Sequence, residues 1–205
     1  MDNRNLEKIF SFLSQAGKLK DVLRYNEKRN GTKESVADHS WRLALMAFIM
    51  AEELGISVDI LKSIKLAIVH DIAESITGDI DAVLIMEGKV LKEEKKKEEI
   101  KAMEEIRKIP PEKVGLEIYG LWNEYEKGET KEAKFIKALD KLETLMHLAE
   151  SGYKTYDKPN LIPTYADEAI KNFPELLPML KIIKRKLKKE FIKGGFEWKE
   201  EYDRI

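Results

Sequence analysis

Side chains that could hold a metal ion are few in this sequence, and their spacing is informative. His70 is followed at once by Asp71, His39 lies upstream and Asp140 downstream, and the chain has only three histidines and no cysteine. Structural zinc usually takes four nitrogen or sulfur ligands in a closed tetrahedron. Two imidazoles and two carboxylates instead suit one divalent ion of the manganese, iron, cobalt or nickel type, ahead of zinc or magnesium. The open coordination positions are where chemistry would occur.

Each of these side chains also has an ordinary structural explanation. His39 lies at a predicted helix start and could belong to the cap. His70 and Asp71 could form the polar end of a buried helix. Asp140 interrupts an apolar helical stripe, where an unpaired charge is costly, so a cation is expected to face it. A neighbouring lysine could supply that charge instead of a metal: Lys137 or Lys141.

Two further side chains bear on the chemistry. Glu74 follows His70 by four residues and Asp71 by three, so all three share a helix face if one helix continues through them. A carboxylate there could hold or deprotonate a water molecule, or it could be an exposed glutamate at a helix end. His147 lies ~10 Å beyond Asp140 along the same helix, too far for both to bind one ion. It is expected in the core or at an interface, which favours a single metal over a histidine-rich two-metal centre.

Three sequence blocks carry a resemblance to a known family. They are residues 34–40 (Glu-Ser-Val-Ala-Asp-His-Ser), 70–79 (His-Asp-Ile-Ala-Glu-Ser-Ile-Thr-Gly-Asp) and 137–140 (Lys-Ala-Leu-Asp). A bare His-Asp pair occurs by chance in many sequences, whereas three blocks in this order with helical stretches between them are specific. The chain resembles the HD-domain metallophosphohydrolases, and most closely their 5'-deoxynucleotidase branch, over residues 6–152.

The resemblance implies roles for individual residues of these blocks. It makes His39, His70, Asp71 and Asp140 the metal ligands. It also makes Glu74 the catalytic carboxylate that handles water.

Contacts to a nucleotide are implied in the same way. Asp79, which spacing alone would make a helix cap, is expected to contact the sugar and to belong to the catalytic network. Arg24 lies in a segment similar to one that carries an arginine near the bound nucleotide, and its planar fork of donors suits a phosphate or sugar. As a lone residue it would be a surface charge. Tyr25 stands where some relatives carry tryptophan. Further candidates for the pocket lining are Lys33, Glu34 and Ser35.

The expected activity is hydrolysis of nucleoside 5'-monophosphates, preferably the deoxyribo forms, to nucleoside and phosphate by a homodimeric phosphomonoesterase. Two alternatives stay open. One is another HD phosphohydrolase, such as a guanosine tetraphosphate hydrolase or a deoxynucleotide triphosphohydrolase. The other is a metal-stabilised helical scaffold without enzymatic activity.

Composition limits the kind of protein and its partners. The chain has 205 residues, of which 43% are hydrophobic and 37% charged, with a formal net charge of -1. A chain of this size can bury roughly 70% of its unfolded surface, so one domain is expected over 1–205. Its motif-bearing core is placed at about 6–152, with C-terminal helices at 161–193 packed on it. The balanced charge gives no reason to expect a nucleic-acid polymer as partner.

A cytoplasmic protein without membrane contact is predicted. No apolar run approaches the ~20 residues that span a bilayer. Charged residues at Asp2, Arg4, Glu7 and Lys8 interrupt any signal-peptide pattern. The absence of cysteine excludes disulfides.

Apolar residues recur at helical rather than alternating spacing, so the predicted fold is all-α. Two amphipathic helices are indicated by the stripes Leu6, Ile9, Phe10, Leu13 and Trp41, Leu45, Phe48, Ile49. Ser57 or Asp59 is expected to cap a third, which leads into His70. A charge run at 92–99 is read as the solvated face of a helix over 88–108. Further helices are expected at 113–126, 131–150, 165–173 and 175–193, the last packing through Leu180, Ile183 and Leu187.

Overall fold

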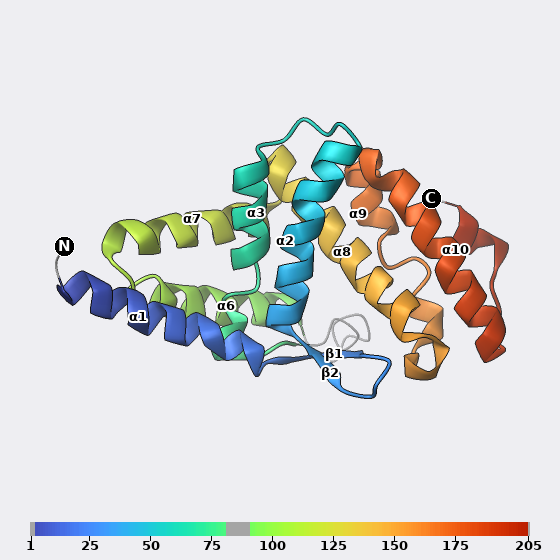
Figure 1. The fold of residues 1–205 in the computed structure, drawn as a ribbon, viewed down its shortest axis with the longest axis horizontal. Coiled ribbons are helices and arrows are strands. Elements are labelled where there is room, and N and C mark those ends of the chain that lie inside the picture. Colours follow the sequence, from blue (N-terminus) through green and yellow to red (C-terminus); the bar gives the residue numbers. More distant parts are fainter. Residues whose placement is uncertain (1–2, 81–90, 205) are drawn as a thin grey trace.

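The computed structural model describes residues 3–80 and 91–204. The molecule is mostly helical (Figure 1), which confirms the predicted class apart from one small hairpin. The α-helices are α1 (Asn3–Gly17), α2 (Val36–Glu53), α3 (Ile60–Val69), α4 (Glu74–Thr77), α6 (Lys92–Ile106), α7 (Glu112–Lys127), α8 (Lys131–Ser151), α9 (Asp167–Asn172) and α10 (Leu177–Gly194). Short 3-10 helices are η1 (Lys18–Lys20), η2 (Tyr153–Thr155), η3 (Pro159–Leu161), η4 (Pro174–Leu176) and η5 (Glu200–Asp203). Residues 88–90, predicted as a helix start, lie outside the described residues.

Helix α8 is the centre of the fold. The Thr130 hydroxyl caps it by accepting a hydrogen bond from the Ala133 backbone N–H, and Gly152, at a φ of 87°, ends it. It packs against α2, α3, α7, α9 and α10, and Figure 1 shows it between α2 and α10. Its fully buried apolar residues are Phe135, Ile136, Leu139, Leu142 and Leu145. Polar side chains on such an enclosed helix must find their partners inside the protein.

The C-terminal helix α10 covers one side of this core. It buries Leu180, Ile183 and Leu187, as the apolar spacing predicts, and it packs on α8 and η2. The single-domain organisation remains a prediction.

The backbone after α3 corrects one expectation. The spacing predicts one helix through His70 and Glu74, but α3 ends at Val69 and α4 begins at Glu74. In the intervening turns the Ile72 N–H donates to the Val69 carbonyl, and the Glu74 N–H donates to the Asp71 carbonyl. His70 therefore caps the end of α3, and Glu74 begins a second helix beyond a bend.

A second apolar cluster holds this bend in place. It joins the turn to α6 and α7, and Phe12 and Ala16 of α1 pack against it. The buried members are Ile72, Ala73, Ala102, Met103, Ile106 and Trp122. Burying this apolar surface outweighs the uninterrupted hydrogen bonds of one straight helix.

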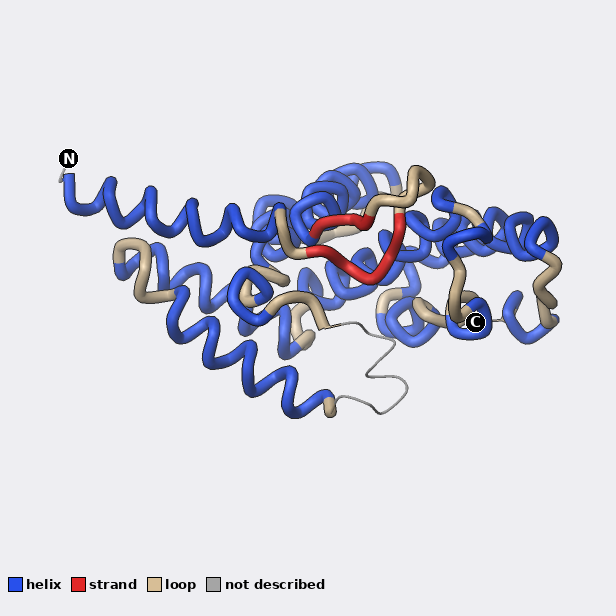
Figure 2. Tube along the Cα trace, turned by 90° about the horizontal axis from the view of Figure 1, so that it is seen from below, coloured by secondary structure: helices blue, strands red, loops and turns tan. Residues whose placement is uncertain are grey.

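The two-stranded hairpin is absent from the sequence prediction. Strands β1 (Leu23–Glu27) and β2 (Lys33–Ser35) pair antiparallel with an irregular register between Leu23 and Glu27 (Figure 2). At the turn, Asn30 Oδ1 accepts from the Thr32 N–H at 3.1 Å and Gly31 has a φ of 81°. The strands are too short to show alternation, but the Asn-Gly pair is a recognised hairpin signal.

The two apolar stripes singled out in the sequence lie at the surface. Leu6, Phe10 and Leu13 of α1 are exposed, Phe10 by 74%, and α1 has no fully buried residue. Trp41 is 68% exposed, and Leu45, Phe48 and Ile49 also face outward. The core-facing side of α2 is instead formed by Val36, Leu43, Met46, Ala47 and Ala51.

In the described part of the chain, no helix combines the length and the apolar character needed to cross a membrane.

The start of α2 is fixed by a reciprocal cap. The Ser35 hydroxyl accepts from the Asp38 N–H at 3.1 Å, and the Asp38 carboxylate accepts from the Ser35 N–H at 3.2 Å. Replacing Ser35 by alanine should lower the free energy of unfolding by about 1 kcal/mol, as measured by urea denaturation. Ser57→Ala is the control, since Ser57 is exposed in the loop before α3 and the cap of α3 is Asp59. Equal effects of both changes would contradict the capping role.

Candidate active site

The structure brings the four predicted ligands together from three helices. His39 comes from the first turns of α2, His70 and Asp71 from the turn directly after α3, and Asp140 from the middle of α8. His39 Nε2 lies 3.1 Å from an Asp140 oxygen, and His70 Nε2 lies 2.9 Å from an Asp71 oxygen. The ligand atoms of His39, His70 and Asp71 all lie within 4.8 Å of one another. A group of this composition could hold a metal ion.

The imidazole orientations support that use. His39 Nδ1 contacts the Glu143 carboxylate, and His70 Nδ1 lies 2.9 Å from the Ala67 carbonyl oxygen. Each Nδ1 thus carries the proton that its acceptor requires, which turns the Nε2 lone pairs toward the centre. Both Nε2 atoms are buried and lack a hydrogen-bond partner among the described residues. Two orphaned nitrogens aimed at nearby carboxylates fit a cation between them.

Without a cation, the same carboxylates draw a proton to His39. Burial and then Arg24 act to lower the pKa of His39, but Glu143 and Asp140 outweigh them and raise it to about 9. Burial likewise acts to raise the pKa of Asp140, and Lys141 and His39 hold it well below its usual range. A metal ion at this position would therefore have to displace a proton.

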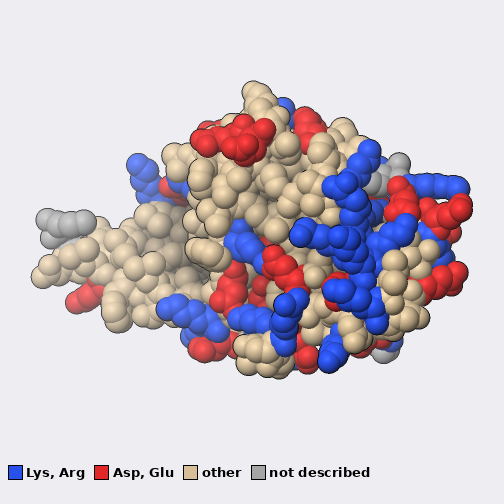
Figure 3. Space-filling view, turned by 45° about the vertical axis from the view of Figure 1, so that its right-hand side comes forward, with Lys and Arg blue, Asp and Glu red and all other residues tan. Residues whose placement is uncertain are grey.

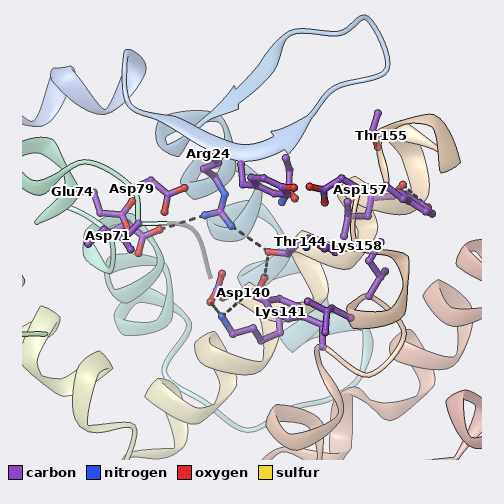
Figure 4. Close-up of a pocket in the computed structure, with 18 of the residues that line it drawn as sticks. Arg24, Asp71, Glu74, Asp79, Asp140, Lys141, Thr144, Thr155, Asp157 and Lys158 are labelled. Carbon is purple, nitrogen blue, oxygen red and sulfur yellow. Dashed lines mark hydrogen bonds and ion pairs between the residues drawn. The ribbon is translucent and has the colours of Figure 1, made fainter. Parts of the chain in front are cut away.

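A pocket opens over Asp71 and Asp140 (Figure 4), and Arg24 of β1 lines it. The guanidinium donates to the Thr144 hydroxyl at 3.2 Å and lies 3.6 Å from an Asp71 oxygen and 3.6 Å from a Glu34 oxygen. Tyr25, the next residue, also lines the pocket. Arg24 is mostly buried, so the alternative of a simple surface charge is excluded.

Glu74 and Asp79 also line this pocket. Glu74 is only 3% exposed, which rules out the exposed helix-end alternative, and Lys95 lies 3.4 Å from its carboxylate. Burial, followed by the charges of Asp71 and Asp79, raises the pKa of Glu74 to about 10. Such a carboxylate binds a proton strongly.

Three residues of β2 that the sequence analysis placed in the pocket lining do not line it. Lys33 is exposed and is not part of the pocket lining; its ammonium group lies 5.9 Å from the centre of the Tyr25 ring. Glu34 is buried behind Arg24, and Ser35 serves as the cap of α2. Neither Glu34 nor Ser35 lines the pocket.

Two lysines that line the pocket, Lys95 and Lys141, are not among the predicted site residues. Lys95 belongs to the charge run read as a solvated face, yet it turns inward to Glu74 and Glu99. Lys141 lies 3.1 Å from an Asp140 oxygen, which is the pairing that the sequence leaves open, and it donates to the Tyr165 hydroxyl at 3.2 Å. Their side chains point into the same cavity. A lysine at helical spacing among glutamates gives no signal of this.

The far wall of the pocket comes from the segment after α8. It is uncharged for the most part and has room for an organic group beyond the metal centre. Its residues include Thr155, Tyr156, Asp157, Leu161, Ile162 and Tyr165.

Comparison with known proteins gives the family. A model of the HD domain matches residues 16–170. The chain belongs to the HD domain family. This match confirms the resemblance carried by the three sequence blocks, and the HD domain model spans the hairpin, α2, α3 and α8, which position the site.

Individual HD relatives match most of the chain. Bovine 5'-deoxynucleotidase HDDC2 (Bos taurus) is 36% identical over 185 residues, which cover 88% of this chain and 86% of the relative. The 5'-deoxynucleotidase hdd1 of Schizosaccharomyces pombe is 36% identical over 69% of this chain and 71% of its own. Among solved structures, a predicted metal-dependent phosphohydrolase from Magnetospirillum magnetotacticum matches with a TM-score of 0.76 and 26% identity, covering 95% of this chain and 99% of that one.

Proposed function

We propose that this HD domain is a metal-dependent 5'-deoxynucleotidase, which hydrolyses deoxynucleoside 5'-monophosphates to nucleoside and phosphate. The observation that carries the proposal is the pair of buried imidazole Nε2 atoms without hydrogen-bond partners, which face Asp140 and Asp71. These two carboxylates line a pocket that cationic side chains also line. The names of the similar relatives supply the substrate class.

The charges of the pocket favour a compact phosphate as ligand. Its inner cations are Arg24, Lys95 and Lys141, and its inner carboxylates are Asp71, Glu74, Asp79 and Asp140. The carboxylates alone would repel a phosphate dianion. A divalent cation at the centre makes the balance positive, so that one terminal phosphate is attracted and its charge is matched by nearby donors. Burial acts to lower the pKa of Lys141, but Asp140 and Tyr165 raise it, which keeps this lysine cationic.

In this proposal His39, His70, Asp71 and Asp140 hold one divalent ion of the manganese, cobalt, nickel or iron type. When bound, such an ion supplies Lewis-acid activation of the phosphoryl group and of water. The nitrogen and oxygen donor set, without sulfur, suits these ions.

The remaining roles fall to the protein's own groups. Arg24 binds and orients the phosphate through its planar donors. Glu74 would accept a proton from the attacking water, since a cation held beside Asp71 would offset the negative charge that raises the pKa of Glu74. The water oxygen bonds to phosphorus while the bond to the 5' oxygen breaks. The proton taken up by Glu74 then passes to the 5' oxygen, so that the products are the nucleoside hydroxyl and phosphate. Asp79, which lines the pocket, would accept a hydrogen bond from the sugar.

A homodimer is also proposed, through the exposed apolar residues of α1 and α2. Leu6, Phe10, Leu13, Trp41 and Phe48 are unusual as exposed residues of a monomer. Figure 3 shows a largely uncharged surface toward the N-terminal end, whereas lysine and arginine gather on the opposite part. Sedimentation equilibrium of the full chain tests this, and a strictly monomeric species would contradict it.

A phosphate-release screen of the metal-loaded protein tests the activity. The substrates are nucleoside mono-, di- and triphosphates, with guanosine tetraphosphate included. Release of pyrophosphate or triphosphate would move the protein to another HD branch. Absence of turnover with every substrate and metal would favour the scaffold alternative.

The metal assignment predicts a particular pH dependence. Because the pKa of His39 is about 9 in the metal-free protein, binding below that pH displaces a proton, so affinity should rise by up to tenfold per pH unit. Titration of the divalent ion by calorimetry at several pH values measures this. His70→Asn and Asp140→Asn should remove most of the bound metal while helical content by circular dichroism is kept. Anomalous diffraction that placed the ion on fewer than three of the four ligands would reject the assignment.

The proposed base can be separated from metal binding. Glu74→Gln should retain the ion but lower kcat by about 100-fold, the scale of a lost general base. Glu99→Gln is the matched control, since Glu99 also lies 3.4 Å from Lys95 but does not line the pocket. Turnover near that of the unmodified protein in a fully metallated Glu74 variant would remove Glu74 from the mechanism.

The sugar preference is a separate prediction. A pocket closed around the deoxyribose penalises an added 2'-hydroxyl by ~1 to 3 kcal/mol, or roughly 10- to 200-fold in kcat/KM. Deoxyribonucleoside 5'-monophosphates should exceed the matching ribonucleotides, and triphosphates and 3'-monophosphates should be poor substrates. Steady-state kinetics on matched pairs measures the ratio. Equal rates would leave the phosphatase class standing and remove the sugar preference.

A further inference from the structure

The third histidine, His147, has no part in the proposed chemistry, but each of its ring nitrogens has a partner on the hairpin. His147 of α8 contacts both strands of the hairpin, and its side chain is 7% exposed. Its Nδ1 lies 3.1 Å from an oxygen of the Glu34 carboxylate on β2. Its Nε2 lies 2.9 Å from the backbone carbonyl oxygen of Glu27 on β1.

Both of these partners are acceptors only. A neutral imidazole carries one N–H, and its other nitrogen presents a lone pair. If His147 were neutral, that lone pair would face the lone pairs of Glu27 or Glu34 at hydrogen-bond distance. Only the imidazolium form, with an N–H on each nitrogen, can donate to both strands at once.

The charges around His147 favour that form. Burial acts to lower the pKa of His147, but the hydrogen bond and charge of Glu34 and the carbonyl of Glu27 raise it above its ordinary value. Glu34 is also approached by Arg24 at 3.6 Å and by Arg42 of α2 at 3.9 Å. Arg42 is itself neutralised by Glu143 and Glu150 of α8, each at 2.6 Å. The other charged groups that line the groove beside His147 are Lys28, Arg29 and Asp38.

The hairpin that His147 contacts also carries the residues proposed to face the substrate. Arg24 and Tyr25 lie on β1 and reach the pocket on the far side of the strand. The Glu34 carboxylate joins the two sides, with one oxygen near His147 and the other near the Arg24 guanidinium. A change in the charge of His147 therefore acts on Arg24 through the Glu34 carboxylate, which contacts both side chains.

We propose that protonated His147 is a positioning residue that pins the β1–β2 hairpin to α8 and so keeps Arg24 and Tyr25 in place for the substrate. Its effect on kinetics rests on the proposed function, whereas the pin itself does not. The pin is complete at a pH below the ordinary value for histidine, near 6.5, and it weakens as the pH rises through the higher pKa of the folded protein. The KM for substrate should rise with it while kcat changes little.

Kinetics of the metal-loaded protein across pH provide one test. His147→Gln is neutral at every pH and can donate to only one strand, so its KM should exceed that of the unmodified protein by about 10-fold at low pH, the scale of one lost charge-assisted hydrogen bond. The two curves should converge at high pH. Since groups at the metal centre titrate in both proteins, the ratio of the two KM values isolates His147. A constant ratio across pH, or a loss in kcat with unchanged KM, would overturn the proposal.

Two further variants sharpen the comparison. Glu150→Gln removes a charge from the same helix face and the same ionic cluster without touching the hairpin, so its KM curve should follow the unmodified protein. His147→Lys keeps a cation at all pH values, so its KM should no longer rise where that of the unmodified protein does. A Glu150→Gln curve like that of His147→Gln would reduce the effect to general electrostatics and reject the pin.

A measurement on the unmodified protein separates the pin from the enzyme activity. Nitrogen-15 spectra should show both His147 ring nitrogens protonated at a pH below about 6.5, the ordinary value for histidine. Hydrogen exchange at the amide of Lys28, which bonds to the Thr32 carbonyl at 2.7 Å, should quicken as that ring loses its proton. A neutral ring at pH 6.5, or exchange that ignores the His147 titration, would overturn the proposal whatever the activity screen finds. A titrating pin in a protein without nucleotidase activity would sink only the proposed function.

Discussion

Buried opposite charges between α2 and α8 set the arrangement on which the site depends. Helix α8 is enclosed by other helices, so its carboxylates Asp140 and Glu143 cannot turn to water. His39 lies between them, and Arg42 closes the outer side of Glu143. Removing one member would leave a buried charge without its counterpart, which is far more costly than the pair itself is stabilising. The register of α2 against α8 is thereby fixed, and with it the direction of the His39 ring.

The bend after α3 is the second requirement, and apolar packing supplies it. A straight helix would place His70, Asp71 and Glu74 along one face at helical spacing. Because α3 ends at Val69 and α4 begins at Glu74, the Asp71 and Glu74 carboxylates reach the same pocket from either side of the bend. The cluster of Ile72 with residues of α6 and α7 makes this bend favourable. At this bend, the burial of apolar side chains therefore matters more than the helical hydrogen bonds that are lost between α3 and α4.

Most helices and the metal-ligand candidates could be predicted from the sequence, because 3.6-residue periodicity and short motifs are local signals. The Asp59 cap and the Leu180 face of α10 follow from that logic. The two strands of the hairpin could not, since they are too short to alternate visibly, and only the Asn-Gly pair at the turn is a local signal for them. Nor could the inward turn of Lys95, because a lysine among glutamates fits a solvated face equally well. The apolar stripes of α1 and α2 are a similar case. Periodicity identifies an apolar face of a helix, but it does not show whether that face packs in the core or lies at the surface, as these two do.

The polar interior also joins the two sides of the molecule. Glu143 fixes His39 on the metal side and binds Arg42, while Arg42 and His147 meet Glu34, which lies against Arg24 at the pocket wall. An apolar interior of the same volume could be at least as stable, but it would leave the hairpin free to slide, since nothing in its short ladder fixes where Arg24 points. Directional contacts with charged partners restrict that freedom. His147, to which neither motif nor spacing assigns a role, is one of the residues that hold the hairpin in this way.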